Sequence, residues 1–414
     1  MRSGVGRVLT ALIALPLLLA GCWDRMEIED QGLVISLGVD KGDRSRYLIT
    51  ASMALVQAVG PMGQVKEPHP DLTEILTAEA ETVSKAMYIL NGATSRHLEF
   101  RHLRALTVGE ELAREGLEPL MTELSRHPRV RGSVAFVVAR GRAFDVLSAN
   151  SPPAEVDPVK VEEGALLQAK RLHLSPPSRM HHFVSRISTQ GIDPMVAAAA
   201  VNPWIKPGPQ MPPGGGLQSA TAGELARGGG NPVEQIGTAI FQRDRLAGFL
   251  NVDETQMLLA LRGEMGKAYI TFPDPDSPED PVTMRFHQEN LPKYVAVYRG
   301  GRPHVTVRIL FEGEVVSTLG GTDFTKPEAR RRLELAATRF ADKTIGELLG
   351  KLSEWEADPV GFGLLFRGRA ASLDAWEAYN WRGRVKDLTV VVETDMRVRR
   401  YGLLTGGGRV DGGR

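Results

Sequence analysis

The alternation of strand-type and helix-type segments is the feature that most restricts the fold of this chain of 414 residues. In residues 32–53, apolar side chains recur at every second position on both sides of a turn at 40–43, which predicts a β-hairpin. Residues 78–90 show helical spacing, and residues 134–139 form an apolar run typical of a buried strand. The first region, up to about residue 200, is therefore predicted to be mixed α/β. Its remaining segments predict a strand at 98–108, one or two short helices at 110–125, and helices at 159–172 and 180–188.

A stretch rich in proline and glycine, residues 202–231, interrupts this pattern. It holds five prolines and two runs of three glycines, a composition that predicts a linker or a mobile loop. Behind it, residues 236–250 predict a second hairpin, and residues 253–261 predict a short helix with Asp253 as its N-cap. The sequence thus predicts a small middle unit.

A third α/β region follows a predicted loop at residues 272–281. Strands are expected at 294–298, 305–311 and 388–398. Thr325–Glu328 has the pattern of a capping box with proline in the first turn. It opens a long helix whose apolar residues, from Leu333 to Trp355, keep close to the 3.6-residue period.

These patterns predict a mixed α/β (α+β) fold of three domains, built of mixed β-sheets with packed helices. The predicted division is a signal peptide at 1–21, an N-terminal α/β domain at 22–200, a linker with a small middle domain at 201–270, a C-terminal α/β domain at 271–405 and a flexible tail at 406–414.

The start of the chain has the pattern of an export signal. A basic start precedes an apolar run of about a dozen residues, Val8–Ala20, which is too short to span a bilayer of roughly 30 Å comfortably. The tetrapeptide Leu19–Cys22 resembles the bacterial lipobox, and Cys22 is the only cysteine. The resemblance implies cleavage between Gly21 and Cys22 and a diacylglycerol on the Cys22 thiol, with the freed amine open to a further acyl chain. The alternative is a plain signal peptide with an incidental cysteine.

The charge balance bears on the partners. Fifty basic and fifty acidic side chains argue against nucleic acid as the main partner, because phosphate binding needs a basic excess. Without Arg2 and Arg7 the body stays near neutral, and no basic patch that would bind anionic lipid without the anchor is expected. A single cysteine allows no intramolecular disulfide and no multi-thiolate metal site.

Several stretches, in order along the chain, resemble one family. They are CWDRMEIED behind the lipobox, LGVDKGD, TSRHLEFRHLRALTVGEELAREGL, GTAIFQRDRLAGFL, DPVGFG and the terminal VVVETDMRVRRYG. Together they resemble the Ger(x)C family of spore germination lipoproteins, the C subunits of nutrient germinant receptors in endospore-forming bacteria.

The resemblance implies a three-domain body attached to the outer face of the spore inner membrane through Cys22. It also implies a complex with two multi-spanning receptor subunits, of A type and B type, and no catalytic activity. Trp23 and Asp24, next to the anchor, are candidates for a membrane-proximal contact, against the alternative of a flexible tether.

Neither a catalytic site nor a metal site is predicted, and the covalent lipid is the sole cofactor expected. Three histidines, His173, His181 and His182, lack the helical spacing of a metal site, because adjacent histidines are expected to point apart. A surface or interdomain patch is expected there instead. Gly361-Phe362-Gly363 is predicted to be a turn that ends the long helix, with Phe362 packed inward, rather than a phosphate loop.

Two other classes of function remain open. A lipid-anchored solute-binding protein would have a ligand pocket between two lobes. A cell-envelope hydrolase is disfavoured because the sequence has no Gly-x-Ser-x-Gly elbow and no His-Glu-x-x-His helix.

Overall fold

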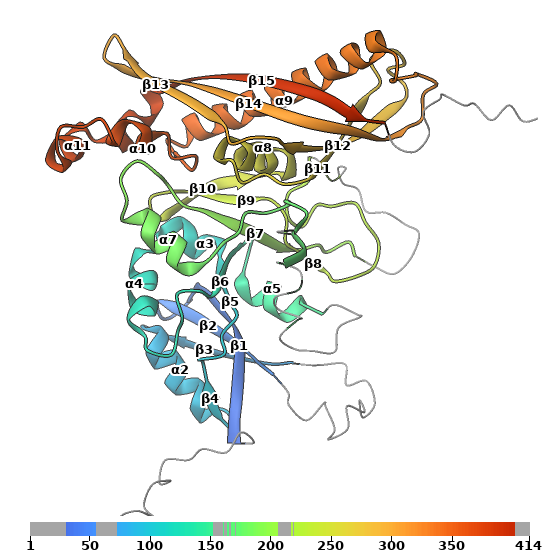
Figure 1. The fold of residues 1–414 in the computed structure, drawn as a ribbon. Helices are drawn as coiled ribbons and strands as arrows, with labels where there is room; N and C mark the ends of the chain where they lie inside the picture. Colours follow the sequence, from blue (N-terminus) through green and yellow to red (C-terminus); the bar gives the residue numbers. More distant parts are fainter. Residues whose placement is uncertain are drawn as a thin grey trace, which may run out of the picture.

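The computed structural model describes residues 30–54, 73–151, 171–205 and 219–401, with a few single positions between 160 and 217. These residues form two β-sheets with helices packed on them (Figure 1). The predicted mixed α/β class, with several domains built of mixed sheets, is confirmed. The predicted loop at 56–70, half of the predicted helix at 159–172 and the tail at 406–414 lie outside the described residues.

The first sheet has ten strands. They are β1 (Gln31–Lys41), β2 (Tyr47–Ala54), β3 (Thr73–Ala80), β4 (His97–Glu99), β5 (Ala105–Gly109), β6 (Ala135–Ala139), β7 (Met195–Val201), β8 (Val233–Glu234), β9 (Thr238–Gln242) and β10 (Arg245–Leu250). Their order is β10-β9-β7-β6-β5-β1-β2-β3, with β4 beside β1 and β8 beside β7. The central strands β1, β5, β6 and β7 run parallel, while β1-β2 and β9-β10 form the two predicted hairpins.

Helices cover both faces of this sheet. One face carries α2 (Val83–Gly92), α3 (Glu110–Glu115), α4 (Glu118–Arg126) and α7 (Met180–Ile187), and the other carries α5 (Ala143–Ala149). The alternation along β6 explains this: Phe136 and Val138 belong to the first core, whereas Val137 and Ala139 belong to the second. A strand buried on both faces is therefore wholly apolar, as the sequence indicates.

Two predicted elements of this region differ from the structure. The helix expected at 78–90 begins only at Val83, because residues 73–80 pair with β2 as an edge strand. Thr82 caps the helix by accepting a hydrogen bond from the Lys85 amide. The strand expected at 98–108 is two strands, since Leu103 donates to the Phe100 carbonyl in a turn and the chain re-enters the sheet further along β1.

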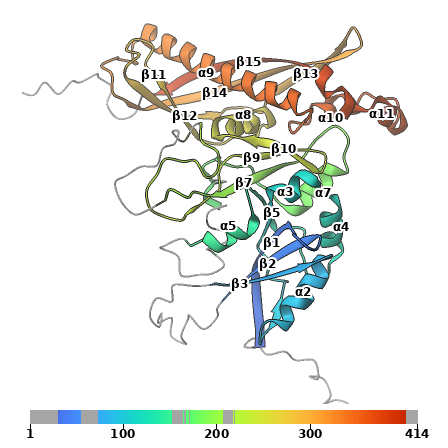
Figure 2. The ribbon, with the colours of Figure 1, turned by 180° about the vertical axis from the view of Figure 1, so that it is seen from behind.

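The hairpin predicted for the middle unit extends the first sheet. β9 pairs with β7, so β9 and β10 form one edge of that sheet. The residue limits of the three predicted domains stay a prediction. Helix α8 (Val252–Arg262) then lies between the two sheets (Figures 1 and 2). Its N-cap is Asn251, in a capping box with Glu254, and not Asp253 as predicted.

The described part of the Pro/Gly-rich stretch is bonded to the sheet edge rather than being an open linker. The Glu234 carboxylate, which is buried, accepts hydrogen bonds from Asn202, Gly223, Leu225 and Arg227. One buried carboxylate therefore fixes these residues to the sheet, although their composition predicts a linker or a mobile loop.

The second sheet lies in the C-terminal region. Its strands are β11 (Ala268–Pro273), β12 (Pro281–Gln288), β13 (Lys293–Arg299), β14 (Arg302–Thr318) and β15 (Thr389–Arg400). The long strand β14 pairs with β13 along its first half, with β12 along its second half, and with β15 in parallel. The predicted loop at 272–281 is shorter, because both of its ends belong to strands.

The long predicted helix, α9 (Pro327–Glu354), packs its apolar stripe on this sheet. Its N-cap is Lys326 and no side-chain cap forms, so the predicted capping box is wrong. Thr325 instead donates its hydroxyl proton to Asp323. The elements α10 (Phe362–Arg367), α11 (Leu373–Tyr379) and the 3-10 helix η3 (Trp381–Asp387) then lead to β15.

The hydrophobic core of the C-terminal half includes residues of the first sheet. On β9, Ala239 and Phe241 face the N-terminal core, whereas Ile240 belongs to the core of α8, α9 and the second sheet. At the end of α9, Trp355 packs so closely on Gly248 of β10 that a Cβ there would lie 2.4 Å from the indole. Lys351 of α9 also pairs with the buried Glu254 of α8 at 2.6 Å.

Candidate functional site

The residues predicted to carry the membrane attachment, Cys22 with Gly21, Trp23 and Asp24, lie outside the described residues. The description begins at Asp30, immediately before β1. Within the described part of the chain, none of the helices combines the length and the apolar character that a membrane crossing requires.

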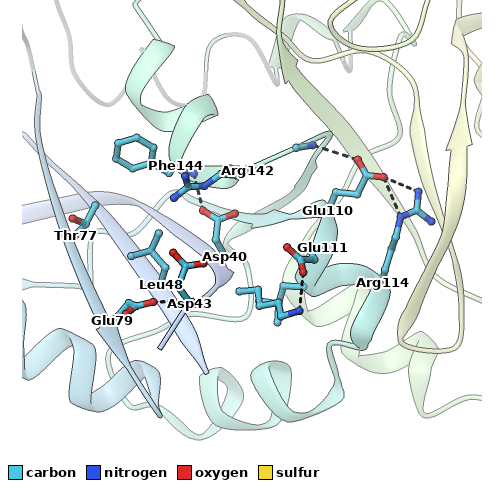
Figure 3. Close-up of a pocket in the computed structure, with 13 residues that line it drawn as sticks. Asp40, Asp43, Leu48, Thr77, Glu79, Glu110, Glu111, Arg114, Arg142 and Phe144 are labelled. Atoms are coloured by element: carbon cyan, nitrogen blue, oxygen red, sulfur yellow. Dashed lines mark hydrogen bonds and ion pairs between the residues drawn. The ribbon is translucent and has the colours of Figure 1, made fainter. Parts of the chain in front are cut away.

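A cavity of about 760 Å³ opens at the carboxyl ends of β1, β5 and β6 (Figure 3). At this edge the chain leaves β5 for α3 on one face of the sheet and leaves β6 toward α5 on the other. A crevice between such diverging connections is where open α/β sheets bind ligands. The sequence alone does not indicate this crevice, because the crevice is assembled from separate segments.

Asp40 lies at the base of this cavity. Its side chain is buried, and its two carboxylate oxygens accept hydrogen bonds from the amides of Ala143 at 2.7 Å and Phe144 at 2.9 Å. Burial raises the pKa of Asp40, although these two hydrogen bonds act in the opposite direction. Gly109 leaves the space that the carboxylate occupies, since a Cβ there would lie 2.0 Å from Oδ1. Asp40 therefore joins β1 to the start of α5.

Most other charged groups of the cavity already have a partner. Lys41 bridges Glu111 and Glu115 at 2.7 Å each, and these two carboxylates raise the pKa of the lysine. Glu110 pairs with Arg114. Glu79 accepts hydrogen bonds from the backbone amides of residues 43 and 44. The Asp43 carboxylate, which is exposed, has no such partner among the described residues. The paired acids do not form the two convergent carboxyl groups that acid–base catalysis needs.

A second polar centre lies where the two halves of the chain meet. Asp358 is buried, and Oδ1 accepts hydrogen bonds from the amides of Gly361 and Phe362 at 2.8 and 2.9 Å. Oδ2 accepts hydrogen bonds from the Gly363 amide at 2.8 Å and from the Trp381 indole at 3.1 Å. Burial raises the pKa of Asp358 to about 6, although the backbone hydrogen bonds act to lower it.

Asp193, from the segment that leads into β7, completes this centre. Its carboxylate accepts hydrogen bonds from the amides of Asp358 and Arg243, and its own amide donates to the Asp358 carbonyl. Arg382 lies 3.8 Å from the Asp193 carboxylate, whose pKa burial raises. We call Asp193 and Asp358, with the groups that donate to them, the aspartate clasp.

Two glycines let the backbones meet at the clasp. A Cβ on Gly363 would lie 2.5 Å from the Gly191 Cα and 2.5 Å from the Trp381 indole nitrogen. Gly361, Phe362 and Gly363 thus begin α10 on the Asp358 carboxylate, and do not end the long helix as predicted. The inward packing predicted for Phe362 is confirmed. The motif DPVGFG contains the signal, an aspartate three residues before the glycine that becomes the N-cap of α10.

The three histidines lie in two places. His173 packs against Gly266, between the N-terminal and C-terminal halves, and His181 contacts the Gly132 carbonyl. The rings of His181 and His182 lie 4.2 Å apart, centroid to centroid, at the start of α7. The expectation that they point apart is therefore wrong. Among the described residues, no group of three or more His, Cys, Asp or Glu side chains could hold a metal ion.

Two family models match this chain, one over the N-terminal region and one over the C-terminal region. Residues 24–201 match the family described as the spore germination protein N-terminal domain. Residues 236–402 match the family described as spore germination B3/GerAC like, C-terminal. The second match begins just before β9, so it includes the hairpin that completes the first sheet.

Whole-length relatives come from Bacillus subtilis (strain 168). The chain is 24% identical to the putative spore germination protein YfkR over 96% of both chains. It is also 24% identical to spore germination protein KC, over 96% of this chain and 95% of that one. The crystal structure of the GerBC protein shares the fold, with a TM-score of 0.51 and 18% identity over 87% of this chain and 96% of that one. On the two domain matches together, this chain belongs to the Ger(x)C family of spore germination proteins.

Proposed function

We propose that this protein is the lipid-anchored C subunit of a spore nutrient germinant receptor and has no catalytic role of its own. The observation that carries the proposal is the ordered match to both germination domains, which begins at residue 24, two residues after the lipobox cysteine. Relatives named spore germination proteins KC, B3 and A3 support the same assignment.

In this proposal Cys22 carries the diacylglycerol and holds the body at the outer face of the spore inner membrane. Each buried CH₂ contributes about 0.8 kcal/mol, so two or three acyl chains give a firm anchor. Cys22 and Asp30 are eight positions apart, which limits the tether to about 27 Å. The start of β1 is then the membrane-proximal end, and the second sheet lies at the opposite end of the molecule (Figures 1 and 2).

The proposed partners are the two multi-spanning subunits of the receptor, of A type and B type. Tethering restricts their encounter to a surface and raises the effective concentration. Trp23 and Asp24 would lie at the membrane interface, where an indole ring is favoured. Most carboxylates of the carboxyl-edge cavity are already paired, which supports an assembly role more than solute binding.

Replacing the cysteine tests the anchor. Spores carrying Cys22→Ala should respond more slowly to nutrients, measured as loss of optical density, while a trigger that bypasses nutrient receptors should act normally. Gly21→Ala is the matched control, because it keeps a small residue beside the cleavage site. A normal nutrient response with Cys22→Ala, at equal protein level, would contradict the proposal.

The partners can be tested separately. Purification of the protein from dormant-spore inner membrane in mild detergent should recover two multi-spanning germination subunits, identified by mass spectrometry. Recovery with a transporter of another class would favour the alternative, a lipid-anchored solute-binding protein.

A further inference from the structure

A second, smaller pocket lies at the opposite edge of the first sheet. It has a volume of about 170 Å³ and lies where β5 and β6 begin. Four arginines line it, Arg101, Arg104, Arg131 and Arg179, and His102 lies beside them. None of the described residues that line it is acidic. We call it the arginine pocket.

The arginines reach this pocket from three separate places in the fold. Arg101 and Arg104 belong to the turn between β4 and β5, Arg131 precedes β6, and Arg179 is the N-cap of α7. Arg179 is held in place by a hydrogen bond to the Ser133 carbonyl. The sheet therefore gathers several positive charges that are dispersed in the sequence.

Two of the four arginines, Arg101 and Arg131, are weakly neutralised by the residues that the structure describes. The Arg101 side chain is 63% exposed and lies 3.4 Å from one Glu99 oxygen. Arg131 has no ion pair or side-chain hydrogen bond with any residue that the structure describes. Like charges at close range repel, and a bound anion relieves that repulsion. Planar guanidinium groups with parallel N–H donors match the oxygens of a phosphate group.

The pocket also lies toward the end of the sheet where the chain enters. β5 starts opposite Ser36, five residues along β1 from Gln31, a distance of about 17 Å. If Cys22 is acylated, the tether of about 27 Å brings this edge within reach of the bilayer surface. The orientation in this step rests on the proposed function.

We propose that the arginine pocket binds the phosphate of an anionic phospholipid headgroup, as a second membrane contact beside the acyl anchor. This proposal departs from the expectation that no basic patch in the sequence would bind anionic lipid without the anchor. That expectation was drawn from the total charge and from basic residues close together in sequence, whereas this cluster forms only when β4, β5, β6 and α7 come together.

The test uses the chain from residue 22 onward with Cys22→Ala, so that no acyl chain contributes. Binding is measured by flotation with vesicles of phosphatidylcholine alone and of phosphatidylcholine with phosphatidylglycerol. Binding to the anionic vesicles is expected, with weakening at high salt. In the variant with Arg101→Gln and Arg131→Gln, the affinity should fall roughly 30-fold.

The matched control replaces Arg299 and Arg302, which lie at the β13–β14 turn of the second sheet, by glutamine. It removes the same charge from the far end of the molecule and should bind as the parent does. Equal losses in the two variants, or retained binding by the pocket variant, would overturn the proposal by showing a net-charge effect.

Free phosphate is the other source of the same chemistry. Saturable binding of inorganic phosphate, followed by thermal shift and lost in the pocket variant, without any binding to anionic vesicles, would overturn the lipid assignment. Because the chain tested carries no acyl group and no partner, this result is independent of the Cys22→Ala germination test. Either hypothesis can therefore fail while the other stands.

Discussion

Single buried acids control much of the local chemistry of this protein. Asp253 follows the N-cap of α8 and has a carboxylate oxygen, Oδ1, that no described residue satisfies. Burial, with Glu254 and Glu347 nearby, raises the pKa of Asp253 to about 7. Unlike Asp358, which has four N–H donors, Asp253 has no hydrogen-bond donor to Oδ1 among the described residues.

Asp253 should make stability depend on pH. The pKa is raised from 3.8 to about 7, so the folded state binds the proton more tightly than the unfolded state. The free energy of unfolding should therefore fall as the pH rises from about 4 to 7, and this contribution should be constant outside that window. Asp253→Asn should remove this contribution and stabilise the protein at pH 8 by on the order of 2–4 kcal/mol, measured by denaturant unfolding.

The exposed Asp374, in the first turn of α11, is the matched control for this change. Asp374→Asn should alter stability by less than about 0.5 kcal/mol and leave the pH dependence in place. An unchanged pH slope in the Asp253 variant would show that other groups cause it.

At the scale of helices and strands, the atoms around a glycine determine how that glycine contributes to stability. Gly346 lies inside α9 with open space around its Cα, whereas Gly363 lies in the first turn of α10 against Gly191 and Trp381. Both are helical glycines, and the sequence around them does not distinguish their roles. The boundaries of helices depend on tertiary contacts in the same way. Helix α2 begins only at Val83, because residues 73–80 pair with β2 as a strand.

The two glycines should respond to alanine in opposite directions. Gly346→Ala should raise the free energy of unfolding by about 0.5–1 kcal/mol, because alanine favours a helix interior. Gly363→Ala should lower it by about 1–3 kcal/mol or more, because the new methyl group overlaps a backbone and an indole. Equal effects of the two changes, measured by denaturant unfolding, would argue against the close approach at the clasp.

At the scale of the whole molecule, the two sheets are held together by direct contacts and not only by the connecting chain. β9 and β10 belong to the first sheet, yet Ile240 and Leu250 belong to the core of the C-terminal half. The aspartate clasp and the contact of Trp355 with Gly248 join the same two halves at other points. Relative motion of the halves would have to break all three connections.

The halves should therefore unfold together. Calorimetry of the chain from residue 22 is expected to show one transition, with equal calorimetric and van't Hoff enthalpies. Trp355→Ala should lower the midpoint of that one transition by removing a contact between the halves. Two separated transitions in the parent protein would show independent domains.

The sequence by itself determined those features that depend on neighbours along the chain. Both hairpins, the buried strand β6, the stripe of α9 and the mixed α/β class follow from local periodicity and turn residues, and the structure confirms them. The motifs quoted along the chain were also enough to indicate the family.

Only the tertiary structure decided which segments meet. It placed the middle hairpin on the first sheet, joined Asp193 to Asp358 across 165 residues, and gathered four arginines from separate elements into one pocket. Strand pairing, burial of a charge and the hydrogen bonds that compensate it are non-local. A periodicity of two or 3.6 residues reports which face of an element is buried, but not which partner buries it.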